Sequence, residues 1–303
     1  MNGLKEYPKI SVIIPSYNQG KFLERTILSV IGQHYPQLEL LVLDGGSTDN
    51  TIEVIKQYSQ YISYWHSQRD KGQANAINQG VKLSSGEIIC WLNSDDMYLP
   101  GTLLEVGERL KNRTQENVLI YGSALIMKED NDGKATSGSS YITHPLKDLS
   151  ELTYRDPIIQ PSSFWTRCLW DAAGPLNEEY NYVLDWDWYI RASQQGYFEC
   201  VPSFFSIYRF HPEHKTSSGG RKRKEEMLKI IQNYSSSYWR DLCDFYQKDY
   251  ASLKKRVNLY NTLKTKPILN RLFRKDYLLK LFFPRIASKL EKPSHFWRIN
   301  SMF

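Results

Sequence analysis

The chain has 303 residues, of which 41% are apolar, 24% are charged and 14% are aromatic. This composition excludes a disordered or fibrous chain and provides enough apolar surface for one large or two small domains. The net charge of +6 is unevenly distributed: residues 1–220 carry a balance of −7, whereas residues 221–303 carry a balance of +13. The sequence therefore predicts an acidic body over residues 1–220 and a basic extension over residues 221–303.

No uninterrupted apolar run approaches the roughly 18 to 20 residues that a helix needs to cross a bilayer. The N-terminal residues continue directly into a strand-like segment, without the apolar core of a signal peptide. The four cysteines form no CxxC pair, which argues against a zinc site or a disulfide framework. We therefore expect a cytoplasmic protein.

Strand-like and helix-like patterns alternate through the first 120 residues. Apolar or β-branched runs predict strands at residues 10–14, 38–43, 62–66 and 87–92. Helical spacing of apolar or small residues predicts the intervening helices, from residue 21 and over residues 51–58 and 72–83. Such repeated alternation is typical of an α/β fold in which helices cover a parallel sheet.

The second half is less regular. Asp, Gly and Ser in residues 130–140 predict an exposed loop or hairpin. Further along, strands are predicted over residues 154–165 and 198–209, with a helix between them over residues 186–195. A second loop over residues 211–220 precedes a basic, helical tail.

Polar clusters follow three of the predicted strands directly, at residues 15–18, 44–49 and 93–96. In open α/β sheets ligands bind beyond the carboxyl ends of the strands, so we expect these clusters at one edge of the sheet. The adjacent carboxyls of Asp95 and Asp96 repel each other unless a cation shares them, and their oxygens suit Mg²⁺ or Mn²⁺ holding a diphosphate. An Asp-rich turn or helix cap is the alternative interpretation.

Two segments permit close approach to a ligand. Residues 44–49, Asp-Gly-Gly-Ser-Thr-Asp, combine glycines with a helix cap, although such a strand-to-helix turn occurs in any α/β protein. Residues 70–80 predict a helix poor in bulky side chains. Lys71, near its start, is placed to meet a phosphate together with the helix N-terminus.

Asp185, Trp186 and Asp187 place two acids among large aromatic side chains. Apolar surroundings raise the pKa of a carboxyl, which suits a general base near neutral pH. The alternative is a helix with an acidic first turn and a Trp face in the core. His211 is more typical of a hydrogen-bonded histidine than of a metal ligand when it is considered alone.

In their order and spacing, these segments resemble the family 2 glycosyltransferases, enzymes of the GT-A fold, over approximately residues 8–217. The resemblance rests on Pro15-Ser16-Tyr17-Asn18, residues 44–49, Asp70-Lys71-Gly72-Gln73 with residues 75–80, Asn93-Ser94-Asp95-Asp96, Gln160-Pro161-Ser162, Asp185-Trp186-Asp187 and Arg209-Phe210-His211. It implies a Rossmann-like, mostly parallel sheet flanked by helices, with the basic helical C-terminal extension outside the match.

The resemblance also implies how the donor nucleotide is bound. Its contacts would come from Pro15, Ser16, Tyr17, Asn18, Asp44, Gly45, Lys71 and Asp95. Among these, Asp44 would accept a hydrogen bond from the nucleobase, and Asp95 would contact the ribose and diphosphate. Asp96 is implied as the ligand of Mn²⁺ or Mg²⁺, with His211 as a further ligand.

The implied reaction is an inverting single displacement. Asp185 matches the catalytic base, and Gln160, Trp186 and Asp187 would lie toward the donor sugar or the acceptor. The base would take a proton from an acceptor hydroxyl as that oxygen attacks the anomeric carbon, while the cation neutralises charge on the departing nucleoside diphosphate. Family members often carry acids where this chain has Asn93 and Leu184, and we expect these departures to tune activity more than abolish it.

The basic tail is a candidate for contact with a membrane surface. From residue 267 onward, Leu and Phe side chains are interleaved with Arg271, Arg274, Lys275 and Lys280. A helix of this composition binds anionic membrane surfaces, but its apolar side chains would equally pack on the catalytic domain. The tail lacks the aromatic platform pattern of nucleic-acid binders, so no nucleic-acid partner is expected.

The leading hypothesis is therefore a sugar-nucleotide glycosyltransferase that acts on a glycan or lipid-linked acceptor in cell-surface polysaccharide or lipid-linked glycan synthesis. The expected location is cytoplasmic, peripheral at the inner face of the cell membrane. An α/β nucleotidyltransferase and a catalytically inactive nucleotide- or glycan-binding module are the alternatives. The carboxyl of Asp185, far along the chain from Asp95 and Asp96, favours transfer to a hydroxyl over nucleotidyl transfer.

Overall fold

The computed structural model describes residues 7–130, 133–215 and 219–248. Contacts within the chain divide it into two compact units, residues 1–223 and residues 224–303. The predicted boundary at residue 220 lies close to this division, while the catalytic and extension roles of the two parts stay predictions.

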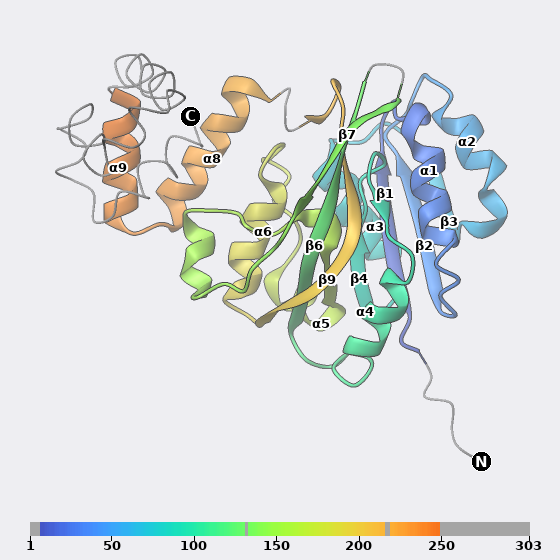
Figure 1. The fold of residues 1–303 in the computed structure, drawn as a ribbon, viewed down its shortest axis with the longest axis horizontal. Helices are drawn as coiled ribbons and strands as arrows, with labels where there is room; N and C mark the ends of the chain where they lie inside the picture. Colours follow the sequence, from blue (N-terminus) through green and yellow to red (C-terminus); the bar gives the residue numbers. More distant parts are fainter. Residues whose placement is uncertain (1–6, 131–132, 216–218, 249–303) are drawn as a thin grey trace, which may run out of the picture. The chain divides into compact units, whose positions relative to one another are not determined.

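The first part of unit 1 alternates strands and helices, as predicted (Figure 1). Its elements are β1 (Ile10–Ser16), α1 (Gly20–Ile31), β2 (Leu38–Asp44), α2 (Thr51–Gln57), β3 (Tyr64–Ser67), α3 (Gln73–Leu83) and β4 (Ile88–Trp91). Every residue of β1 and β4 is buried. Both strands are mostly apolar because helices cover the two faces of the sheet.

The remainder of unit 1 departs further from the sequence pattern. It contains β5 (Met97–Tyr98), α4 (Thr102–Leu110), β6 (Val118–Glu129), β7 (Ala135–Tyr141), β8 (Ser163–Thr166), α5 (Arg167–Ala173), α6 (Leu184–Ser193) and β9 (Tyr197–Phe210). The strand predicted over residues 154–165 is wrong for most of its length, since short 3-10 turns at Leu149–Thr153 and Gln160–Ser162 flank irregular chain. Pro157 and Pro161 lack the N–H that a sheet ladder needs.

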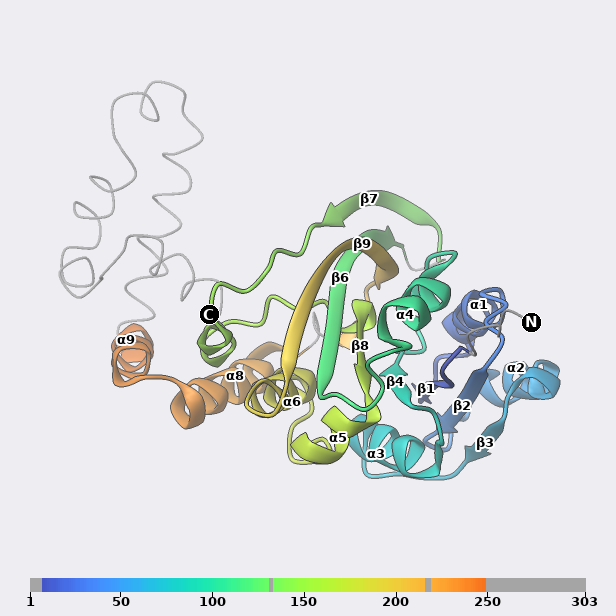
Figure 2. The same cartoon turned by 90° about the horizontal axis from the view of Figure 1, so that it is seen from below.

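Among the described residues, nine strands form one sheet in the order β3-β2-β1-β4-β8-β6-β9-β5, with β7 paired to β6. The strands from β3 to β4 run parallel, and β8 joins them to the parallel pair β6 and β9 in the antiparallel sense. Helices α1 and α4 cover one face, and α3, α5 and α6 cover the other (Figure 2). This mostly parallel mixed sheet flanked by helices confirms the predicted fold class.

The register of the parallel strands places the polar loops together. Ser16 at the end of β1 pairs with Asp44 at the end of β2, and β4 runs beside β1 in the same direction. Their carboxyl ends therefore meet at one edge of the sheet, where the loops after all three strands begin.

Unit 2 contains the greater part of α8 (Gly220–Tyr234) and all of α9 (Ser237–Lys248). Its buried apolar side chains include Ile230, Ile231, Trp239 and Leu242. No helix in the described ranges is long and apolar enough to cross a membrane. The basic and apolar segment after residue 267 lies outside the described residues, so its contact with a membrane stays a prediction.

Candidate active site

A cavity of about 830 Å³ opens at the carboxyl ends of β1, β2 and β4. Its wall includes half of the side chains predicted for the site, namely Pro15, Ser16, Tyr17, Gly45, Asp95, Gln160 and Asp185. These residues come from loops that are far apart in the sequence. The parallel register brings them to one place, as the position of the polar clusters after the strands predicts.

The other predicted residues lie outside this wall: Asn18, Lys71, Asp44, Asp96, His211, Trp186 and Asp187. The side chain of Asn18 joins two loops, because its Oδ1 accepts a hydrogen bond of 2.8 Å from the backbone N–H of Thr48. Lys71 is exposed to solvent. Asn18 therefore shapes the site indirectly. Lys71 lies outside the cavity wall, and its expected contact with a phosphate stays a prediction.

Asp44 organises the loop after β2 from a fully buried position. Its Oδ2 accepts hydrogen bonds from the backbone N–H of Gly46 at 3.1 Å and of Ser47 at 2.9 Å. The hydroxyls of Ser47 and Ser67 donate to Oδ1 and Oδ2 at 2.5 and 2.6 Å. These protein donors occupy the carboxylate, which lies outside the cavity wall, and the role of Asp44 as acceptor for a nucleobase stays a prediction.

The two carboxyls of the acidic loop, residues 93–96, point in different directions. Asp95 lines the cavity, whereas Asp96 is 1% exposed and faces the protein interior. Oδ1 of Asp96 accepts a 3.0 Å hydrogen bond from the backbone N–H of Arg209, and Oδ2 lies 3.4 Å from Nδ2 of Asn93. Burial, followed by the charge of Asp95, raises the pKa of Asp96 well above its ordinary value. Asp96 thus turns away from the cavity, and its role as a metal ligand stays a prediction.

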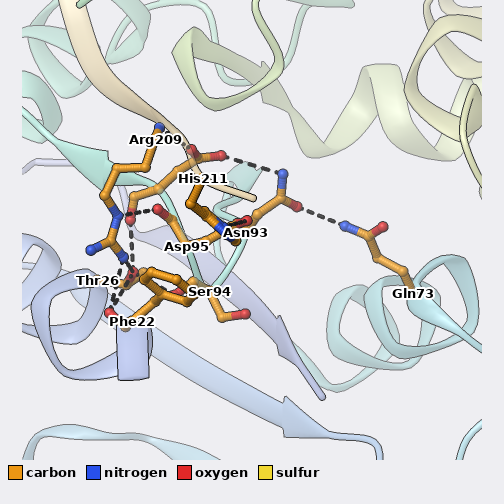
Figure 3. Close-up of polar contacts among 9 residues, drawn as sticks. Phe22, Thr26, Gln73, Asn93, Ser94, Asp95, Arg209 and His211 are labelled. Carbon is orange, nitrogen blue, oxygen red and sulfur yellow. Dashed lines mark hydrogen bonds and ion pairs between the residues drawn. The ribbon is translucent and has the colours of Figure 1, made fainter. Parts of the chain in front are cut away.

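Arg209, near the end of β9, binds the backbone of the acidic loop (Figure 3). Its buried guanidinium donates to the carbonyl oxygen of Asp95 and, at 3.0 Å, to that of Phe22 in α1. On the same helix, the hydroxyl of Thr26 lies 2.8 Å from the carbonyl oxygens of both Ser94 and Asp96. The backbone of the loop is therefore fixed by buried donors from α1 and β9.

Asp95 and His211 form a pair beside the cavity. Nε2 of His211 lies 3.1 Å from Oδ2 of Asp95, and the His211 ring stacks on Phe22 with 4.1 Å between ring centroids. Nδ1 of His211 is buried without a hydrogen-bond partner. The 3.1 Å separation is that of a direct hydrogen bond between the two side chains. Two ligands at right angles on a divalent cation, each about 2.1 Å from it, also lie about 3 Å apart, so a cation could replace the hydrogen bond without moving either residue far.

This pair would supply only part of a coordination shell. No group of three or more His, Cys, Asp or Glu side chains in the described part of the chain is arranged to hold a metal ion. Mg²⁺ commonly binds through one or two protein ligands together with substrate phosphates and water. A cation at Asp95 and His211 would therefore depend on a phosphate-bearing ligand to complete its shell.

A chain of polar contacts connects the acidic loop to the far side of the cavity. Nε2 of Gln73, the first residue of α3, donates at 2.7 Å to Oδ1 of Asn93 (Figure 3). The ammonium of Lys215 donates at 2.6 Å to Oε1 of the same Gln73. Gln73 and Lys215 both line the cavity, so the loop after β9 is joined to the acidic loop through α3.

Asp185 lies in the first turn of α6 and lines the cavity. Burial raises the pKa of its carboxyl, while the N–H of Trp186 and the charges of Lys215 and Arg223 oppose that change. Asp156 lies close enough that burial and the charge of Asp185 raise the pKa of Asp156 well above its ordinary value. The side chain of Asp156 is exposed on its outer side, so solvent reaches it there while its carboxyl stays within range of the Asp185 charge.

The other residues predicted near the sugar differ in their placement. Gln160 lines the cavity, and its Nε2 donates at 2.9 Å to the carbonyl oxygen of Trp91, while its buried Oε1 has no hydrogen-bond partner. Trp186 is buried and donates from Nε1 to the carbonyl oxygen of Leu152. Asp187 is buried and pairs with Arg191 at 3.0 Å. Trp186 and Asp187 thus support α6 and do not face the cavity.

Several residues of the site are not among the sequence predictions. The cavity wall includes Arg69, Asp70 and Lys215, and Asp156 adds a second carboxyl beside Asp185. Asp70 belongs to a segment that carries the family resemblance, so a signal for it was present. Arg69, Lys215 and Asp156 have no local pattern that distinguishes them from surface charges.

Comparisons with known proteins agree on one family. The model of glycosyl transferase family 2 matches residues 11–155. A PGL/p-HBAD biosynthesis glycosyltransferase of Mycobacterium bovis (strain BCG / Pasteur 1173P2) is 30% identical over 188 residues, which cover 61% of this chain and 69% of that protein. A chondroitin synthase of Escherichia coli is 27% identical over 233 residues, covering 75% of this chain but 33% of the synthase.

The fold is similar to that of a solved structure. The crystal structure of S. aureus TarS 1-349 in complex with UDP-GlcNAc superimposes with a TM-score of 0.58 at 17% identity, covering 96% of this chain and 92% of that one. At this identity the likeness concerns the fold alone. The family model, together with a 30% identical relative of which this chain spans more than two thirds, shows that the chain belongs to glycosyltransferase family 2.

Proposed function

We propose that this glycosyltransferase transfers a sugar from a nucleoside-diphosphate sugar to an acceptor hydroxyl with inversion at the anomeric carbon. The observation that carries the proposal is that Asp95 and Asp185 line the same cavity. Oδ2 of Asp95 lies 3.1 Å from Nε2 of His211, with which it would share a cation, and Asp185 is a carboxyl with a raised pKa. The two chemical requirements of the transfer, a stabilised leaving group and a base, thus meet at one site.

Asp185 acts as the base in this scheme. Its carboxylate takes the proton of the acceptor hydroxyl as the hydroxyl oxygen forms a bond to the anomeric carbon. The bond from that carbon to the diphosphate oxygen breaks in the same step, which inverts the configuration and needs no covalent enzyme intermediate. The crowded position of Asp185 raises its pKa toward neutrality and makes it a better proton acceptor than an exposed aspartate.

Asp95 and His211 would hold the Mg²⁺ or Mn²⁺ ion. When bound, the cation neutralises the negative charge that develops on the leaving nucleoside diphosphate. Asp96, the ligand expected from the sequence, instead fixes the backbone from which Asp95 projects. Arg69 and Lys215, which line the cavity wall, are better placed to supply positive charge to the phosphates than Lys71, which lies outside it.

The donor would lie along the cavity from the loop after β1 to Gln160. Tyr17 is 61% exposed at the cavity wall and offers a ring on which a nucleobase can stack. The unpartnered Oε1 of Gln160 would accept a hydrogen bond from a hydroxyl of the donor sugar or of the acceptor. The match to TarS bound to UDP-GlcNAc supports a sugar nucleotide as donor.

A glycan or lipid-linked acceptor is proposed from the relatives and from the tail. The relatives act, by their names, in PGL/p-HBAD biosynthesis and as a chondroitin synthase. Peripheral binding to the inner face of a membrane through the basic tail would bring the enzyme to lipid-linked acceptors. Replacement of Arg271, Arg274, Lys275 and Lys280 by Glu should abolish sedimentation with vesicles rich in anionic lipid, and unchanged sedimentation would exclude this route.

The catalytic assignment is tested by Asp185→Asn, with the exposed Asp171→Asn on α5 as a matched control. Asp185→Asn should bind nucleoside-diphosphate sugars normally in calorimetry but lose about 10²- to 10⁴-fold in turnover, the usual contribution of a general base. Asp171→Asn should retain both properties. Turnover at the wild-type rate in Asp185→Asn would exclude Asp185 as the base.

The same assays separate the alternative functions. A nucleotidyltransferase would release pyrophosphate, whereas the proposed reaction releases a nucleoside diphosphate. A catalytically inactive binding module would bind the donor in calorimetry and release neither product. Loss of turnover on chelation, with recovery on addition of Mn²⁺ or Mg²⁺, is expected from the Asp95 and His211 pair.

A further inference from the structure

Gly45, in the cavity wall, has no side chain, and a carboxylate from another loop occupies the space beside it. Gly45 follows β2 directly, and a Cβ atom built on Gly45 would lie 2.9 Å from Oδ2 and 3.3 Å from Cγ of Asp70. Both residues line the cavity. The carboxylate of Asp70, from the loop between β3 and α3, therefore occupies the space that a side chain at residue 45 would take.

This carboxylate is available to a ligand in a way that the neighbouring Asp44 is not. Asp44 is fully buried and receives hydrogen bonds from Gly46, Ser47 and Ser67. Asp70 is only half-buried and lies on the cavity wall. Tyr17, whose ring is 61% exposed, lies on the wall of the same cavity, so a planar ligand in the cavity can contact both the ring and the Asp70 carboxylate.

The orientation of Asp70 is also fixed. Its Oδ1 accepts a 2.7 Å hydrogen bond from the backbone N–H of Gly72, whose φ of +113° favours glycine at that position. With Oδ1 held in this way, Oδ2 is the oxygen that faces Gly45. Asp70 thus holds an acceptor oxygen in a fixed orientation beside Gly45, which has no side chain.

We propose that Asp70 reads the nucleobase of the donor and selects bases that carry a ring N–H on their pairing edge, namely uracil, thymine and guanine. This inference rests on the proposed use of a nucleoside-diphosphate sugar. A carboxylate oxygen accepts a hydrogen bond from such a ring N–H. Cytosine and adenine instead present a ring nitrogen with a lone pair at the corresponding position, which the carboxylate repels.

The test uses nucleoside diphosphates without a sugar, so that sugar preference has no influence. The affinities of UDP, TDP, GDP, CDP and ADP are measured by calorimetry in the presence of Mn²⁺. The tightest binder among UDP, TDP and GDP should bind the wild-type chain about 10- to 100-fold more tightly than CDP or ADP. This range corresponds to one hydrogen bond to a charged group. Equal or tighter binding of CDP or ADP would overturn the assignment.

Asp70→Asn provides the sharper measurement. Because Gly72 N–H holds Oδ1, the amide should keep its oxygen there and place its NH₂ group where Oδ2 now lies. A donor then replaces the acceptor, so the ratio of the Kd values for UDP and CDP should shift toward CDP by at least about tenfold. An unchanged ratio would refute the role of Asp70, whatever the absolute affinities.

Because Gly45 has no side chain, the carboxylate can be transferred from residue 70 to residue 45 by a pair of substitutions. The φ angle of Gly45 lies outside the left-handed region, so the backbone there tolerates an aspartate. The space for its side chain opens when Asp70 is replaced by Ala. Asp70→Ala should lose the preference, and Asp70→Ala with Gly45→Asp should regain it in part. Failure of the wild-type chain to bind any of the five nucleotides would contradict the proposed function itself, whereas binding without base preference would contradict only the assignment of Asp70.

Discussion

Replacement of Asp96 by Ala should destabilise the protein much more than replacement of Asp95 by Ala. Asp96 is 1% exposed, and its removal leaves the buried N–H of Arg209 without its 3.0 Å acceptor and frees the side chain of Asn93. An unsatisfied buried donor costs about 1–3 kcal/mol, so with the lost contacts we expect a decrease of about 3 kcal/mol in the free energy of unfolding. Asp95→Ala retains the backbone carbonyl that Arg209 holds and should cost about 1 kcal/mol.

Urea unfolding and donor turnover distinguish the two roles. Asp96→Asn is the matched variant, because it keeps an oxygen for the Arg209 N–H and should lose only a fraction of the stability lost by Asp96→Ala. Asp95→Ala should unfold near the wild-type urea midpoint yet lose its response to Mn²⁺. A wild-type urea midpoint in Asp96→Ala, combined with lost dependence on Mn²⁺, would refute this reasoning and restore Asp96 as the ligand.

Two further changes probe the pH response and the packing of the site. Asp156→Asn removes a negative charge beside Asp185 and should therefore lower the pKa of Asp185. The acid limb of the pH profile of kcat/KM should move to lower pH. An unmoved limb would mean that the two carboxyls do not interact. Gly80→Ala places a Cβ 2.5 Å from Cγ2 of Ile13, where α3 packs on β1, and should cost about 1–3 kcal/mol in calorimetric unfolding; an unchanged Tm would show that α3 can shift.

The sheet and its loop edge could be predicted because their signals are local. The apolar runs that become β1, β2 and β4 end in polar residues, and parallel strands necessarily end at the same edge. The strand predicted over residues 154–165 is wrong because apolar and aromatic content there reflects burial beneath the cavity, with Gln160 in a 3-10 turn. Composition alone does not distinguish a buried, irregular segment from a strand, and here Pro157 and Pro161 are the only local signals against a strand.

The individual roles in the site could be predicted less well than its location. Asp44 and Asp96 each stand beside a residue that faces the cavity, Gly45 and Asp95, and sequence spacing does not determine which of two neighbours turns inward. That choice depends on distant partners such as Ser67 and Arg209. The sequence position of a motif therefore identifies the loop, and long-range hydrogen bonds determine which of its side chains meets the ligand.

The anchoring of the acidic loop by Thr26 and Arg209 has a consequence for the thermodynamics of ligand binding. Its backbone carbonyl oxygens at residues 94–96 are held by buried side chains from α1 and β9, so the loop has lost its conformational freedom before any ligand arrives. A ligand that binds Asp95 need not order this backbone, and the entropic penalty of association falls accordingly. Temperature-dependent calorimetry should then show a heat-capacity change that reflects surface burial alone, without a contribution from loop folding.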